Sequence, residues 1–229
     1  MRRLRDSMAR GTVLFDYDGT LHNSMRIYGP ALRSAIKWLE DEGWLEPASY
    51  SDEWISRWLG WTTKDMWTTF APQLPQEVWT KASAMVGTQM DNLTASGKGA
   101  LFDGVPQMLQ ELLDDGWELG FLSNCRCAYR DAHRRQYELD RWISAYYCAE
   151  DYPGMAKWEI YESAIRTSGH PLPHVMIGDR FHDIEVGTKA HIATIGCRYG
   201  YGEASELDAA SACVDNPLQI PETVKELLS

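Results

Sequence analysis

The stretch from residue 13 to residue 20 constrains the fold most, because an apolar run there ends in two acids and a glycine. Residues 13–15 have the composition of a short buried strand. Gly19 can adopt backbone angles that other residues avoid, so the chain can turn sharply after the strand. We therefore expect Asp16 and Asp18 just beyond the carboxyl end of this strand, where ligands bind in open α/β sheets.

The two acids one residue apart indicate a cation site. Neighbouring carboxylates repel each other unless a cation or a proton lies between them. Mg²⁺ suits such a site because it prefers oxygen ligands, and a carboxylate beside it can also act as a nucleophile that forms an aspartyl-phosphate. The alternative is an ordinary strand end, since Asp and Gly are common in turns for conformational reasons.

Length and charge limit the classes of protein that are possible. The chain has 229 residues, enough for one large domain or for a core and a smaller domain. Its net charge of −11 argues against a general nucleic-acid binder. No apolar run is long enough for a membrane span, and the arginines of residues 1–10 precede no apolar segment, so we expect a solvated tail rather than a secretory signal.

The five cysteines are odd in number and irregularly spaced. No two CxxC pairs occur, so the sequence gives little support to a structural zinc site. Reduced thiols in a cytoplasmic protein are the simpler interpretation.

The region of residues 25–97 has apolar residues at helical spacing in four segments and no convincing strand. Seven of the ten tryptophans lie in this region, and filling a small helical core explains most of them. Trp61 differs because it follows Gly60 in an expected interhelical loop. We therefore expect a helical domain over residues 22–97, inserted into a core made of residues 1–21 and 98–229.

The remainder of the chain alternates between strand-like and helical patterns. The expected strands are residues 117–122, 145–148, 175–177, 193–197 and 212–214. Such alternation implies right-handed crossovers and a parallel sheet. The predicted fold is therefore an α/β core with a Rossmann-like parallel sheet and an inserted all-helical domain.

Polar residues recur at or after the ends of the expected strands. They are Asp16 with Asp18, Ser123 with Asn124, Lys157, and Asp179 with Asp183. Aspartates supply oxygen ligands for Mg²⁺, a serine and the N–H groups after it can hold phosphate oxygens, and a lysine can neutralise phosphate charge. Each residue alone has an ordinary explanation, as a helix cap, a surface lysine or a turn. Together they suit phosphoryl transfer, which depends on positioning and charge stabilisation.

In its motifs the chain resembles the haloacid-dehalogenase superfamily, and in particular its phosphoglycolate-phosphatase-like branch. The DxDGT motif of that family matches residues 16–20, and its GDxxxD motif matches residues 178–183. Between them, Ser123 and Lys157 match the second and third motifs, in the same order along nearly the whole chain. The helical insertion matches the family's cap domain. Lys157 is followed by Trp158, where relatives often carry proline-rich sequence.

The resemblance implies roles for individual residues. Asp16 would be the nucleophile and Asp18 the general acid and base. Mg²⁺ would be held by the Asp16 carboxylate, the Asp18 backbone carbonyl and Asp179, with Asp183 in support. The resemblance also implies that Ser123 and Lys157 take part in catalysis, and that the substrate is bound by Gly19, Thr20, Ser123, Asn124, Lys157 and, through the cap, Trp61.

The sequence thus predicts a Mg²⁺-dependent phosphatase of small phosphomonoesters that works through an aspartyl-phosphate. The expected partner is a small phosphorylated metabolite, with no nucleic acid and no membrane, and the protein is expected to be a monomer or a homodimer. A phosphomutase of sugar phosphates and a catalytically silent binding or regulatory protein on the same fold remain as alternatives.

Overall fold

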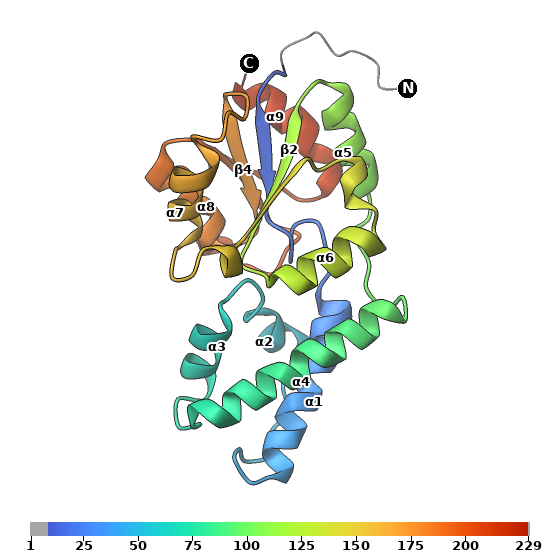
Figure 1. Ribbon diagram of the computed structural model, residues 1–229, viewed down its shortest axis with the longest axis vertical. Coiled ribbons are helices and arrows are strands. Elements are labelled where there is room, and N and C mark those ends of the chain that lie inside the picture. Colours follow the sequence, from blue (N-terminus) through green and yellow to red (C-terminus); the bar gives the residue numbers. More distant parts are fainter. Residues whose placement is uncertain (1–8, 229) are drawn as a thin grey trace.

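The computed structural model describes residues 9–228. Residues 1–8, which contain most of the expected arginine tail and the start of the first predicted core segment, lie outside the described residues. The described chain has a sheet with helices on both faces at one end and a group of helices at the other (Figure 1). Within the described residues, no helix is both long and apolar enough to cross a membrane.

The sheet has six strands within residues 9–228, all parallel, in the order β3-β2-β1-β4-β5-β6. The strands are β1 (Thr12–Phe15), β2 (Glu118–Ser123), β3 (Ala145–Cys148), β4 (His174–Gly178), β5 (Ala193–Cys197) and β6 (Ala212–Val214). This arrangement confirms the predicted Rossmann-like α/β fold. Because β1 pairs with β2 on one side and β4 on the other, the chain reverses its direction of travel there, which opens a crevice beyond the carboxyl ends of these strands.

The central strand β1 is buried on both faces, as a parallel strand between two helical layers should be. Its side chains alternate: Val13 and Phe15 join one apolar cluster, and Leu14 joins another. The first cluster includes residues of α5 (Val105–Asp114), α6 (Cys127–Gln136) and α9 (Ile220–Leu228). The second includes residues of α7 (Lys157–Ile160) and α8 (Phe181–Ala190).

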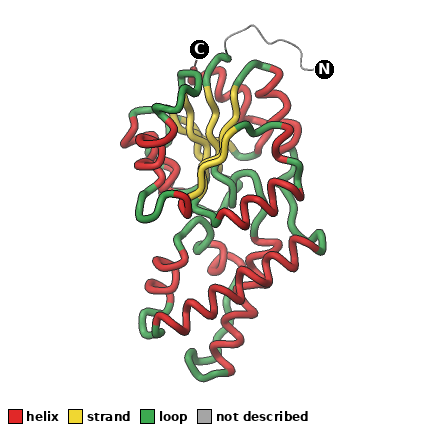
Figure 2. Tube along the Cα trace, in the orientation of Figure 1, coloured by secondary structure: helices red, strands yellow, loops and turns green. Residues whose placement is uncertain are grey.

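The four helices α1 to α4, here called the helical cap, lie beyond the carboxyl ends of the strands (Figure 1). They are α1 (Met25–Asp41), α2 (Asp52–Ser56), α3 (Thr63–Phe70) and α4 (Gln76–Ala95). Figure 2 shows this part of the molecule as helices and loops only. The cap has its own apolar cluster, in which the fully buried Trp67 donates its indole N–H to Ser83 at 2.6 Å. The predicted domain limits at residues 22 and 97 stay predictions.

Short elements connect the strands and helices of the core. They are η1 (Leu139–Arg141), η2 (Ala149–Asp151), η3 (Tyr161–Ile165), η4 (Ala204–Leu207) and η5 (Pro217–Gln219). The segment η3 is a π-helix. Helix α2 ends at Ser56, although apolar residues at helical spacing, which predict a longer helix, continue to Leu59. Residues 57–60 form a loop whose carbonyl groups bond to the core, as described below.

Replacing Leu112 of α5 with alanine should destabilise the core. Leu112 is fully buried against the sheet, and a buried Leu→Ala change typically costs about 2–5 kcal/mol of unfolding free energy. Leu172→Ala is the matched control, because that side chain is 70% exposed and should change stability by less than about 0.5 kcal/mol. Urea unfolding followed by circular dichroism measures both, and equal losses would contradict the packing described here.

Candidate active site

The turn after β1 brings the first motif against the fourth. The Tyr17 carbonyl accepts backbone N–H groups of residues 20–22, which closes a tight turn directly after Asp16. Gly19 has a φ of +91°, and a Cβ atom there would lie 2.2 Å from Oδ2 of Asp179. Glycine is therefore needed twice at this position, for the backbone angle and for the close approach to Asp179.

A buried lysine joins residues from distant parts of the chain. Lys157, the first residue of α7, donates from Nζ to Oδ1 of Asp16 at 2.5 Å and to Oδ1 of Asp183 at 2.6 Å. Asp179 follows β4 and completes the group, since Asp16, Asp179 and Asp183 each have a carboxylate oxygen within 4.8 Å of the others. All four side chains are buried. The structure thus brings together four of the residues singled out in the sequence.

Burial and mutual repulsion shift the protonation of this cluster. Burial raises the pKa of Asp16 to about 7, although Lys157 acts against the shift. Burial also holds the pKa of Asp179 well above its usual range, and the charges of Asp16 and Asp183 add to this effect. Burial acts to lower the pKa of Lys157, but the adjacent carboxylates outweigh it and raise that pKa. The cluster of three carboxylates and Lys157 therefore has too little positive charge to balance its carboxylates.

The chemistry of this cluster fits a hard divalent cation. Three buried carboxylates lie together, and the single ammonium group among them contacts only Asp16 and Asp183, which leaves negative charge uncompensated in a buried region. The remaining donor atoms are all carboxylate oxygens, the kind of ligand that Mg²⁺ and similar cations prefer. Asp16, Asp179 and Asp183 are thus able to hold such a cation.

Asp18 belongs to a separate hydrogen-bond network. Its Oδ1 accepts from Oγ of Ser24 at 2.5 Å and from the hydroxyl of Tyr129 at 2.8 Å, and it lies 3.7 Å from Nδ1 of His22. Burial acts to raise the pKa of this carboxyl, but the nearby His22 and the hydrogen bonds from Ser24 and Tyr129 outweigh it and lower the pKa. The two aspartates of the first motif, Asp16 and Asp18, therefore have opposite shifts, which suits different tasks.

The predicted phosphate-binding residues occupy two different places. Ser123, the last residue of β2, and Asn124 line a cavity together with Asp16. Asn124 also donates from Nδ2 to the Gly60 carbonyl of the cap at 3.1 Å. Thr20 is fully buried, and its hydroxyl donates to Oδ1 of Asp179 at 3.5 Å. Thr20 and the neighbouring glycine of the turn thus contact Asp179 and are not in the wall of this cavity.

The cavity has a volume of about 390 Å³ and extends from the carboxylates into the cap. Asp16 and Asp18 lie at one end. Its other walls are mostly apolar and aromatic, formed by Tyr28, Trp58, Leu59, Trp61, Met66, Trp67, Val86, Met90 and Tyr129. Arg126 is the one cationic side chain among its lining residues in the described part of the chain. The predicted cap residue Trp61 thus lies in the cavity wall. Its ring is edge-on to that of Trp58, with 5.5 Å between the ring centroids.

Among the site residues that the sequence did not reveal, Tyr129 and Arg180 make the contacts with the most consequence for the arrangement. Tyr129 of α6 donates to Asp18, although its helical position carried no motif. Arg180 is buried, and its guanidinium donates to the carbonyls of Arg57 and Leu59 in the cap loop and to Glu206 at 2.9 Å. Its place directly after Asp179 was the available signal. Together with Asn124, Arg180 ties the cap loop to the edge of the sheet.

Comparison with known proteins agrees with this arrangement. A family model described as haloacid dehalogenase-like hydrolase matches residues 13–197. A 5'-nucleotidase of Pseudomonas aeruginosa is 30% identical over 119 residues, which are 51% of this chain and 54% of that protein. The chain thus matches only about half the length of this relative.

Solved structures share the fold over nearly their whole length. A predicted phosphatase from Clostridium acetobutylicum superposes with a TM-score of 0.80 at 21% identity, covering 96% of this chain and 100% of that one. A predicted phosphoglycolate phosphatase from Haemophilus somnus gives a TM-score of 0.77 at 19% identity, covering 95% and 99%. At such identities the likeness concerns the fold alone. Because the family match spans most of the sequence and includes every residue of the buried cluster, this chain belongs to the haloacid dehalogenase-like hydrolase family.

Proposed function

We propose that this protein is a Mg²⁺-dependent phosphatase of small phosphomonoesters. The observation that carries the proposal is the buried contact of Lys157 with Asp16 and Asp183, beside Asp179, in which Asp16 also lines an open cavity. A binding protein has no need of a carboxylate that is held by an ammonium group and also faces a ligand cavity. Family membership and the order of the motifs give further support.

In the proposed first step, Asp16 attacks phosphorus through a carboxylate oxygen and the bond to the leaving oxygen breaks. Asp18 gives its proton to that oxygen. The pKa of Asp18 is low in the free protein, but the negative charge of a bound phosphate raises it and favours the protonated form. Asp16, Asp179 and Asp183, with the Asp18 backbone carbonyl, would hold Mg²⁺, which neutralises charge on the phosphoryl oxygens when bound.

In the second step, the anionic Asp18 takes a proton from water, and the water oxygen attacks the aspartyl-phosphate. The bond between phosphorus and Asp16 breaks and inorganic phosphate leaves. Ser123 and Asn124 line the cavity beside the nucleophile and would hold phosphate oxygens, while Lys157 keeps Asp16 oriented. A phosphomutase would instead return the phosphoryl group to a sugar, so release of inorganic phosphate separates the two functions.

The size of the cavity and its apolar walls favour a substrate whose leaving group is larger and less polar than glycolate. Its aromatic walls match a planar ring, because ring faces and edges pack favourably against each other. The name of the Pseudomonas aeruginosa relative, a 5'-nucleotidase, agrees with such a group. We therefore propose aryl and nucleoside monophosphates as better substrates than phosphoglycolate.

Removal of divalent cations should abolish turnover. We expect phosphate release from an aryl phosphate to stop in excess EDTA and to return with added Mg²⁺. Mg²⁺ should also raise the thermal unfolding midpoint, because a ligand of the folded state stabilises it by about 2.7 kcal/mol at one hundred times its Kd. Asp179→Asn should lose this rise. Full activity in EDTA would refute the metal assignment.

The two acids of the first motif should be separable in a rapid-quench experiment. Asp18→Asn removes the proton donor and acceptor, worth about 10²–10⁴-fold in rate. With an aryl phosphate the first step needs little protonation, so this variant should accumulate a phosphoenzyme that mass spectrometry detects. Asp16→Asn should accumulate none. Equal phosphorylation of both variants would place the nucleophile elsewhere.

Trp61→Ala should change substrate preference more than stability. We expect kcat/KM for a nucleoside monophosphate to fall about tenfold relative to phosphoglycolate, because lost aromatic packing is worth about 1 kcal/mol or more. Trp44→Ala is the matched control, since Trp44 is a cap tryptophan that is 42% exposed and does not line the cavity. If Trp61→Ala lowers kcat/KM equally for all substrates and the variant protein also unfolds more readily, Trp61 belongs to the apolar core of the cap instead.

A further inference from the structure

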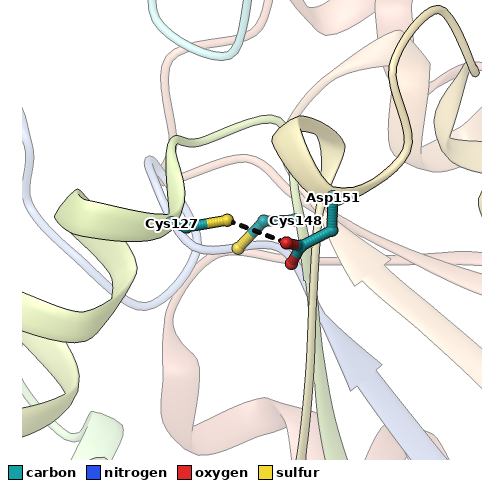
Figure 3. Close-up of side chains that lie close together, drawn as sticks. All are labelled: Cys127, Cys148 and Asp151. Carbon is teal, nitrogen blue, oxygen red and sulfur yellow. Dashed lines mark hydrogen bonds between the residues drawn. The ribbon is translucent and has the colours of Figure 1, made fainter.

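Three thiols gather beside the cavity and take no part in the proposed hydrolysis. Cys127 begins α6, Cys148 ends β3, and both face Asp151 of η2 (Figure 3). Cys127 donates from Sγ to Oδ1 of Asp151 at 3.2 Å. The third thiol, Cys125, follows Asn124 in the cavity wall, and its Sγ lies 3.7 Å from Sγ of Cys148.

The surroundings of Cys148 favour its thiolate. Nη1 of Arg130 lies 3.6 Å from Sγ of Cys148 and 3.1 Å from Oδ2 of Asp151. The hydrogen bond from Cys125 lowers the pKa of Cys148 against the opposing effect of burial, and Arg130 lowers it further. The same hydrogen bond raises the pKa of Cys125. The contact between the two sulfur atoms therefore favours loss of the proton from Cys148 rather than from Cys125.

A metal site at these thiols is the weaker interpretation. Cys127, Cys148 and Asp151 have donor atoms within 4.8 Å of one another. However, the Arg130 guanidinium already contacts both Cys148 and Asp151 and supplies the positive charge there. Burial and the hydrogen bond to Asp151 also raise the pKa of Cys127 to about 12, so this thiol keeps the proton that metal binding would have to remove.

We propose that Cys125 and Cys148 are an oxidation site, where a small peroxide forms a reversible disulfide that stops turnover. The Cys148 thiolate takes the proton of Cys125, which lines the cavity, and the Cys125 sulfur attacks one peroxide oxygen. The O–O bond breaks, the other oxygen leaves as water with a proton from solvent, and Cys125 becomes a sulfenic acid. The Cys148 sulfur then attacks the Cys125 sulfur. The S–O bond breaks, and the hydroxyl leaves as a second water with the proton of Cys148.

The disulfide acts on turnover through the segment that holds the phosphate-binding residues. A disulfide has an S–S length of about 2.05 Å, so the two sulfurs, now 3.7 Å apart, must approach each other. Cys148 lies inside the sheet, whereas Cys125 lies in the loop after β2, so the loop moves. That loop carries Asn124 with its bond to Gly60, and Ser123 stands just before it. A misplacement of about 1 Å in a catalytic site can cost about 10²-fold in rate.

Peptide mapping tests the proposal directly. The reduced full-length protein is treated with hydrogen peroxide, alkylated and cleaved with trypsin, which separates Cys125 from Cys127 because it cuts after Arg126. We expect a linked peptide pair containing Cys125 and Cys148, with a loss of two hydrogens. We also expect phosphate release to fall at least about tenfold, since the loop is displaced, and dithiothreitol to reverse both changes.

Variants make the test specific. Cys148→Ser should form no linked pair and keep its own basal turnover in peroxide. Cys213→Ser is the matched control, because Cys213 lies on β6 at the other edge of the sheet, and it should respond as the unaltered protein does. A link between Cys127 and Cys148, or no link at all, would overturn the proposal, as would bound Zn²⁺ that blocks alkylation of all three thiols.

The activity effect rests on the proposed phosphatase function, whereas the disulfide does not. If the linked pair forms while turnover is unchanged, the oxidation site stands and its effect on turnover is refuted. If the reduced protein releases no phosphate from any phosphomonoester, the proposed function fails, and the mass of the linked peptides still decides whether the oxidation site exists.

Discussion

The ammonium group of Lys157, buried between the carboxylates of Asp16 and Asp183, is the contact on which the carboxyl edge of the sheet depends. It joins residues 141 positions apart in the sequence, and neither carboxylate has another cation as close in the described part of the chain. Removing one member of a buried charge pair typically costs about 3–5 kcal/mol, because the remaining charge is left uncompensated. The charge pairs of Lys157 therefore stabilise this edge of the sheet.

Small residues allow the backbone to close around Asp179. A Cβ at Gly19 or Gly200 would lie 2.2 or 2.3 Å from a side-chain atom of that residue, and one at Gly202 would lie 2.0 Å from its backbone oxygen. The backbone N–H of Tyr201 donates to Oδ2 of Asp179 at 2.7 Å. The carboxylate is thus enclosed by backbone rather than by large side chains, and water is kept away from it. Such enclosure explains why burial is the main cause of its raised pKa.

The charged cluster and most of the aromatic cavity wall lie on different parts of the molecule. The core supplies the carboxylates and Lys157, while the cap supplies most of the aromatic cavity wall. Two sets of hydrogen bonds connect the core to the cap: Arg180 donates to carbonyls of the cap loop, and Asn124 donates to the carbonyl of Gly60. Cap residues of the cavity wall can therefore change without disturbing the charged cluster, as long as these links remain.

The linear sequence was enough to predict the parallel sheet and the positions of the acids at strand ends. These features depend on local periodicity and on the rule that parallel strands end at one edge, which brings Asp16, Lys157 and Asp179 together. Local signals also located the helices of the cap, although they missed the end of α2, because the loop after it is held by a distant arginine.

Tertiary structure alone decided which partners each polar side chain of the site contacts. One residue separates Asp16 from Asp18, yet the first contacts Lys157 and the second contacts Tyr129, whose helix lies more than one hundred residues further along the chain. The opposite pKa shifts of these two acids arise from those partners and from burial. The aromatic cavity wall and the contact between Cys125 and Cys148 likewise join separate segments. No periodicity encodes such contacts, because they form only when the segments pack against each other.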